Sequence, residues 1–204
     1  MIEDLRELVA ATEPLLRPGT AGDAWIEDDA RFVLVCTNGR HDPCCASLGR
    51  PLARSLRESE WATRVWESSH IGGDRFAGNL LLLPESLYFG RCEATAAVRV
   101  LDAYDAGRLH LTRFRGRSAL SLVEQAAEHF VRAELELDRI DAVASIETLE
   151  AGRVRVVAGT TGQERALVVT VKRSSTRAPT PLTCRGALGL EYPTFSLVGI
   201  DIDD

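Results

Sequence analysis

Three of the chain's five cysteines and one glycine-rich histidine turn lie close together in the first half of the sequence. Eight residues separate Cys36 from Cys45, and Cys44 directly precedes Cys45. His70 begins the segment His-Ile-Gly-Gly-Asp, which ends at Asp74. Thiolates and imidazoles are the ligands that hold zinc, copper and iron–sulfur clusters in proteins. The residue types therefore predict a metal or redox centre, and they leave open whether Asp74 belongs to it.

Two predicted strands lead to these residues. The apolar, β-branched run 31–36 predicts a buried strand that ends at Cys36. Open α/β folds place their sites at the carboxyl edge of such strands. Alternating residues 63–68 predict a second strand that leads to His70. The two glycines after His70 allow positive φ, so the backbone can approach closely whatever this histidine contacts.

A helix is predicted between the two strands, over residues 43–58. Asp42 is a suitable N-cap, and Pro43 suits the first helical position. Cys44 and Cys45 then lie in the first turn, where the positive end of the helix dipole favours a thiolate. The helix should therefore bring its cysteines to the same edge of the sheet as the strand ends.

The remaining pattern predicts the fold class. Further expected elements are a helix over 2–16, an edge strand over 24–26, strands over 79–84 and 87–90, a helix over 94–106, a helix within 118–135 that begins with a Ser121–Glu124 capping box, and β structure over 142–174. The tail after residue 174 shows little periodicity and is expected to wrap over the core. This order predicts an α/β fold. A thioredoxin-like layer, a mixed sheet with flanking helices, occupies residues 1–112, and a smaller α+β lobe occupies residues 113–204.

Composition limits the possible partners and the cellular compartment. The chain has 204 residues and a net charge of −6, whereas nucleic-acid binding requires a basic face. Arg113, Arg115 and Arg117 form the only compact basic cluster, for which we expect a solvated loop. No apolar run approaches the roughly 20 residues that cross a bilayer, and the charged N-terminus is not a signal peptide. An odd number of cysteines argues against a disulfide framework, so we expect a cytoplasmic protein with reduced thiols. Cys92 and Cys184 are expected to be buried structural thiols.

The text around the cysteines carries a family resemblance. The matching segments are residues 34–39 (LVCTNG), 42–46 (DPCCA), 65–73 (VWESSHIGG), 75–79 (RFAGN), 88–91 (YFGR), 115–118 (RGRS) and 125–128 (QAAE). Together they resemble the sucrase/ferredoxin-like family, whose members are thioredoxin-fold proteins that carry a 2Fe–2S cluster. The resemblance extends from residue 34 to residue 128.

The resemblance implies a set of ligands. In that family, two cysteines and the two histidines of a His-x-Gly-Gly-His turn hold the cluster. Cys36 and Cys45 would then bind one iron and His70 the other, whereas Asp74 stands in the place of the second histidine. A carboxylate there would make the centre anionic, so its reduction potential should fall relative to a two-histidine site. If Asp74 does not bind, His41 is the best replacement, although the ordinary interpretation of His41 is a solvated loop histidine.

We therefore expect an electron-transfer protein, not a catalyst, that passes single electrons to a redox protein partner such as a reductase or oxidoreductase. Neither nucleic acid nor a membrane is an expected partner.

Three alternatives stay open. The chain could be a cluster-free binding or scaffold module in which Asp74 is an ordinary turn residue. Cys36, Cys45, His70 and Asp74 could instead hold Zn²⁺, for which this mixed set is acceptable. Cys44, otherwise a packed thiol beside the ligands, could be the reactive thiol of an oxidoreductase, although adjacent cysteines lack the usual two-residue spacing.

Overall fold

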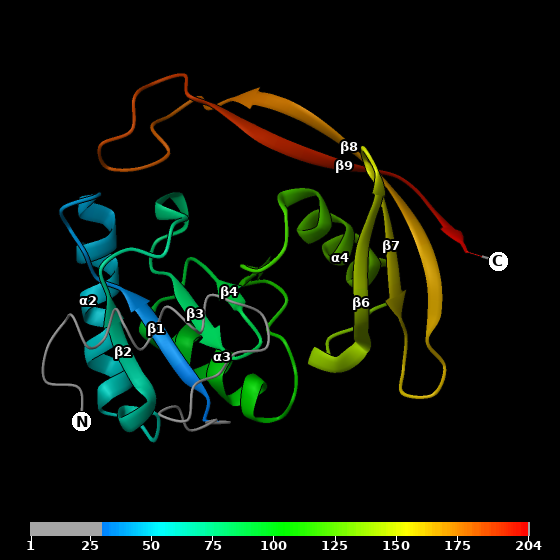
Figure 1. Cartoon of the computed structure of the whole chain (residues 1–204). Coiled ribbons are helices and arrows are strands. Elements are labelled where there is room, and N and C mark those ends of the chain that lie inside the picture. The colour runs from blue at the N-terminus through cyan, green and yellow to red at the C-terminus, as the bar shows by residue number, and fades with distance from the viewer. Residues whose placement is uncertain (1–29, 204) are drawn as a thin grey trace, which may run out of the picture. The chain divides into compact units, whose positions relative to one another are not determined.

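The structure is a computed structural model that describes residues 30–203 (Figure 1). The predicted helix over 2–16 and the edge strand over 24–26 lie outside the described residues. The helices and strands are β1 (Phe32–Cys36), α2 (Pro43–Arg57), β2 (Val65–Ser68), β3 (Leu80–Leu83), β4 (Leu87–Phe89), α3 (Ala94–Asp105), β5 (Phe114–Arg117), α4 (Leu122–Glu134), β6 (Val143–Glu150), β7 (Arg153–Ala158), β8 (Arg165–Arg177) and β9 (Glu191–Ile202), with short 3-10 helices η2 (Ala62–Arg64), η3 (Asp74–Phe76) and η4 (Ile140–Ala142). The fold is mixed α/β, as predicted.

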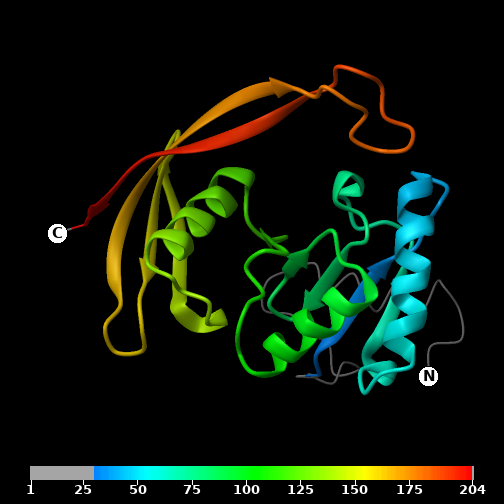
Figure 2. The same cartoon turned by 180° about the vertical axis from the view of Figure 1, so that it is seen from behind.

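The first sheet has five strands in the order β2-β1-β3-β4-β5. β1 pairs with β2 in parallel, and the other neighbours are antiparallel. Helices α2 and α3 contact each other and cover the same face of this sheet (Figure 2). The order strand–helix–strand–hairpin–helix that was predicted for residues 31–106 is confirmed.

The core of this layer forms between the two helices and the sheet. β1 buries Val33 and Val35, which point toward the helices' buried residues because alternate side chains of a strand share a face. The helices contribute Leu52 and Leu56 from α2 and Val100 from α3, and each of these residues is at most 1% exposed. A packed core on this side fixes the end of β1 against the start of α2, and both places carry cysteines.

The second sheet is antiparallel, with the order β6-β7-β8-β9, and α4 packs on it. The β structure predicted for 142–174 is confirmed, but the expectation of an irregular wrapping tail is wrong. Residues 191–202 form β9, which pairs with β8 from Leu167–Ile202 to Arg177–Glu191. Pro193 and Gly199 interrupt the sequence pattern of this segment, yet an edge strand tolerates both residue types.

A buried ion pair stabilises α4 at the point where it meets the first sheet. The capping box predicted at Ser121 is present, and α4 begins at the following residue. Glu128 and Arg132 are fully buried one helical turn apart, and their Oε1 and Nε atoms lie 3.0 Å apart. Arg117 of β5 donates to the same Glu128 oxygen over 3.1 Å. Arg117 is therefore not part of a solvated loop.

No helix within residues 30–203 is long and apolar enough to cross a membrane.

Candidate metal centre

Cys36 is the last residue of β1, and its backbone is fixed on both sides. Its N–H donates to the carbonyl oxygen of Asn79 over 3.3 Å, and the next N–H, of Thr37, donates to the carbonyl of Ser68 over 3.2 Å. The thiol is free, and the residue is only 1% exposed. The strand therefore presents one buried sulfur at the carboxyl edge of the sheet, as the sequence predicts.

Cys45 lies in the first turn of α2, which begins as predicted. An Asp42 Oδ1 atom accepts from the N–H of Cys44 over 2.8 Å, which is the expected N-cap bond, and Pro43 occupies the first turn. Cys45 is free and fully buried. The N-cap therefore determines where the helix starts, and with it where the second sulfur lies.

Gly49 allows α2 to approach Cys36, and the sequence analysis did not single it out. A Cβ atom at Gly49 would lie 1.9 Å from the carbonyl oxygen of Cys36. Only a residue without a side chain permits this contact between the helix and the end of β1. A lone glycine inside a predicted helix is the signal that could have identified it, because glycine is unfavourable there unless packing requires it.

Hydrogen bonds from two residues hold the His70–Asp74 turn, and the sequence analysis gave neither residue this role. Gly72 and Gly73 have φ values of +82° and +66°. Asn79 Nδ2 donates to the carbonyl oxygen of Gly73 over 2.8 Å, and Tyr88 Oη donates to that of Gly72 over 2.5 Å. A Cβ atom at Gly73 would lie 2.7 Å from Tyr88 Oη, so this bracing also requires a glycine.

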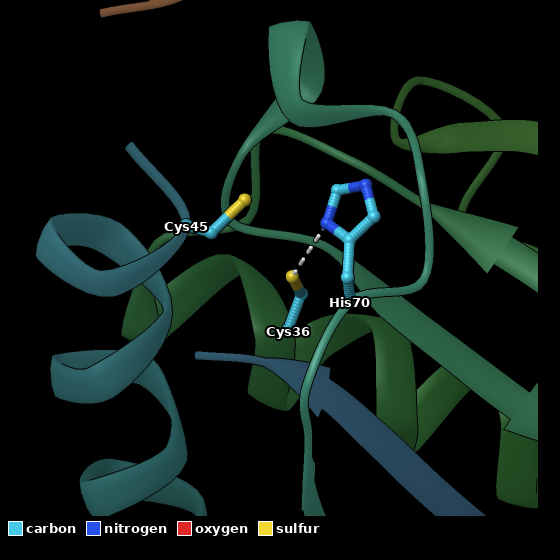
Figure 3. Close-up of side chains that lie close together, drawn as sticks. All are labelled: Cys36, Cys45 and His70. Atoms are coloured by element: carbon cyan, nitrogen blue, oxygen red, sulfur yellow. Dashed lines mark hydrogen bonds between the residues drawn. The ribbon is translucent and has the colours of Figure 1, made fainter. Parts of the chain in front are cut away.

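Cys36, Cys45 and His70 converge from three separate elements (Figure 3). All three potential ligand atoms lie within 4.8 Å of one another. The Sγ atom of Cys36 is 3.8 Å from His70 Nδ1, which is the ring nitrogen that faces the sulfurs. The structure therefore brings together three of the four residues that the sequence analysis proposed, in an arrangement that could hold a metal.

Asp74 is not part of that trio. It belongs to a second group, His41, His70 and Asp74, whose ligand atoms also lie within 4.8 Å of one another. His41 Nε2 is 3.5 Å from Asp74 Oδ2, and the rings of His41 and His70 are 3.9 Å apart between centroids. His70 is therefore shared between a group that contains two thiols and a group that contains a second imidazole and a carboxylate.

The surroundings of Cys45 disfavour its ionised form. Burial raises the pKa of the Cys45 thiol to about 12, and its neighbours Cys36, Asp74 and Asp42 add to the shift. Two adjacent thiolates beside carboxylates are unfavourable in a buried site. A bound metal cation would reverse this balance, because ligating cysteines are deprotonated.

Cys44 and Cys184 form a disulfide that the sequence analysis did not predict. It joins the first turn of α2 to residues 178–190, here called the β8–β9 loop, with a Cα–Cα distance of 5.8 Å. The same loop donates from Arg185 N to Asp42 Oδ2 over 3.0 Å. The expectations of a buried, free Cys184 and of no disulfide are therefore wrong, since the contact spans 140 residues and depends on the β8–β9 hairpin. Cys92 is buried and free, as expected.

Comparison with known proteins assigns a family to this arrangement. The sequence model of the sucrase/ferredoxin-like family matches residues 3–116, which include both cysteines and the whole His70–Asp74 turn. No curated protein and no solved structure matches the chain. The family match spans more than half of the sequence and contains every donor in the two groups around His70. The chain belongs to the sucrase/ferredoxin-like family.

Proposed function

We propose that this protein is a one-electron carrier whose 2Fe–2S cluster is held by Cys36, Cys45, His70 and a fourth donor from the group that contains His41 and Asp74. The observation that carries the proposal is the convergence of two buried free thiols and one imidazole nitrogen within 4.8 Å. When bound, a 2Fe–2S cluster supplies reversible one-electron transfer.

The donor set fits such a cluster in kind and in arrangement. In mixed cysteine/histidine 2Fe–2S centres, two imidazoles replace two thiolates on one of the irons. Here both thiols lie in one group with His70, and the second group joins His70 to His41 and Asp74. The chain's own residues would keep the thiolates away from water through the burial of Cys36 and Cys45. The bonds from Asn79 and Tyr88 would hold the His70 turn in place.

Zinc is the second candidate, because Cys36, Cys45 and His70 with one further donor make an acceptable tetrahedral set. A single Zn²⁺ needs four ligands, whereas the two groups together offer five donors and share only His70. Two groups that share one histidine favour a centre with two metal atoms. A cluster-free module of the same fold is the third candidate, and it predicts no metal at all.

A group of arginines beside the turn supports a redox protein as partner. The guanidinium carbons of Arg75, Arg91 and Arg115 lie 4.6, 5.6 and 5.2 Å from the centre of the Phe76 ring. None of the three forms an ion pair with a carboxylate within residues 30–203. Uncompensated positive charge next to an electron-transfer centre favours a partner with an acidic surface, since complementary charge speeds encounter.

Metal analysis of anaerobically purified protein tests the proposal. We expect iron and acid-labile sulfide in equal amounts, together with visible thiolate-to-iron absorption. Cys36→Ser and His70→Ala should remove most of the iron, whereas Cys92→Ser, which changes a buried free thiol outside the site, should retain it. Stoichiometric zinc without sulfide would establish the zinc alternative. Iron-free, colourless protein from aerobic and anaerobic preparations, and after reconstitution, would refute the proposal.

A further inference from the structure

His41 lies on the turn between β1 and α2, and its ring contacts the candidate centre. The ring centroids of His41 and His70 are 3.9 Å apart, with a tilt of 33° between the planes. The Nε2 atom of His41 is 3.5 Å from Asp74 Oδ2, and its side chain is 54% exposed. Two imidazoles therefore lie side by side, and the group that holds both of them with Asp74 contains no thiol.

The side-chain geometry gives Asp74 a different role from that of a ligand. Metal-bound histidines almost always donate their second ring N–H to a carboxylate, a carbonyl or water. The contact between Asp74 and His41 Nε2 suits this role and leaves Nδ1 of the ring for a metal. His70 likewise faces the thiols with Nδ1.

Charge also favours an imidazole over a carboxylate as the fourth ligand. Two thiolates and two neutral imidazoles leave an oxidised 2Fe–2S centre formally neutral, whereas a carboxylate in place of one imidazole makes it anionic. The site is buried around Cys36 and Cys45, and one buried carboxylate, that of Asp42, already caps the helix that carries Cys45. An additional uncompensated charge in such surroundings is costly.

The β8–β9 loop holds the backbone that carries His41. Arg185 Nη1 donates to the carbonyl oxygens of Arg40 and His41 over 2.8 and 3.4 Å. The N–H of Arg185 donates to Asp42 Oδ2 over 3.0 Å. The histidine is therefore anchored through its own carbonyl and through both of its neighbours in the sequence.

We infer that His41 is the fourth ligand of the centre and that Asp74 orients it as a hydrogen-bond acceptor. The assignment rests on the proposed function. It makes the centre a two-cysteine, two-histidine site whose second histidine comes from the turn before α2.

The test uses pulsed electron paramagnetic resonance on the reduced, reconstituted holoprotein. It counts the nitrogen atoms that bind the cluster. We expect two strongly coupled nitrogens in the wild-type protein and in Asp74→Asn, which keeps an acceptor next to His41. His41→Gln should show one, and its reduction potential should fall as Asp74 takes the vacant position. His129→Gln, an exposed histidine on α4, is the matched control and should show two.

The possible results separate this inference from the proposed function. A single coupled nitrogen in the wild-type protein, unchanged in His41→Gln, would overturn the role of His41 and leave the cluster in place. Protein that takes up no iron and sulfide would refute the proposed function, and the assignment of His41 with it. Because the count in the wild-type protein decides the question alone, the test does not depend on the stability of a variant.

Discussion

Replacing Gly49 by alanine tests whether the close approach of α2 to β1 forms the centre. The added Cβ would lie 1.9 Å from the Cys36 carbonyl oxygen and 3.0 Å from its carbonyl carbon. Both obstacles are backbone atoms, so no side-chain rotation can relieve the contact. The helix must move relative to the strand.

The size of the effect follows from these distances. Ordinary contact begins at 3.4 Å, so α2 must shift by about 1.5 Å, the difference from the 1.9 Å contact. Overpacking costs about 1–3 kcal/mol, and this case belongs at the upper end because the backbone cannot yield. Alanine gains about 1 kcal/mol over glycine inside a helix. The net loss is therefore about 2 kcal/mol, which lowers the melting temperature of a chain of this size by about 4–8 °C.

Thermal unfolding and metal analysis of the same samples check both consequences. The shift moves Cys45 relative to Cys36, so we expect Gly49→Ala to bind clearly less iron even at temperatures where it is folded. Gly199→Ala in β9 is the matched control, because a Cβ atom there meets nothing within 4 Å. A Gly49→Ala protein that melts and loads metal like the control would refute the packing explanation.

Three further predictions concern a cap, the disulfide and the arginines. Hydrogen bonds from Ser121 hold the pKa of Glu124 below its ordinary value, so its contribution to stability is present above pH 4.5 and is lost as the pH falls through the lowered pKa. In urea unfolding, Glu124→Gln should be less stable than the wild-type protein at pH 7 by up to about 1 kcal/mol, and a difference that persists at pH 2 would contradict this. Cys184→Ser should lower the free energy of unfolding by about 2–4 kcal/mol under oxidising conditions, whereas equal stabilities with and without a dithiol reductant would argue against the disulfide. Arg91→Gln should slow the oxidation of reduced holoprotein by ferricyanide several-fold at low ionic strength but not its oxidation by a cationic cobalt complex, and equal slowing with both oxidants would exclude a charge effect.

The elements around the centre could be predicted because their signals are local. The run that ends at Cys36, the Asp42–Pro43 helix start and the Ser121–Glu124 capping box each lie within a few residues of the feature that they determine. Such patterns determine local structure whatever the rest of the chain does, and the structure confirms all three. The cysteine and histidine spacing, together with the segments around these residues, also sufficed to identify the family.

The features that were missed depend on contacts between distant segments. β9 exists because β8 offers it a partner, and its own sequence is interrupted by Pro193 and Gly199. The Cys44–Cys184 disulfide joins residues that no local pattern relates. Likewise, the contact between His41 and Asp74 joins the turn before α2 to the His70–Asp74 turn. Arg185 from the β8–β9 loop helps to hold the turn before α2, and no local sequence pattern near His41 predicts this contact.

The β8–β9 loop links the second sheet to the candidate centre, although the second sheet contributes no ligand in our assignment. The carboxylate of Asp42 accepts from Cys44 N at the start of α2 and from Arg185 N in the loop. One side chain therefore caps the helix that carries Cys45 and anchors the turn that carries His41. If the loop is released, the thiol side and the imidazole side of the centre should loosen together. Cys184→Ser should then lose iron faster than the wild-type protein, whereas Glu124→Gln, which weakens α4 instead, should lose iron at the wild-type rate. Equal iron loss from both variants would mean that the loop acts only through global stability.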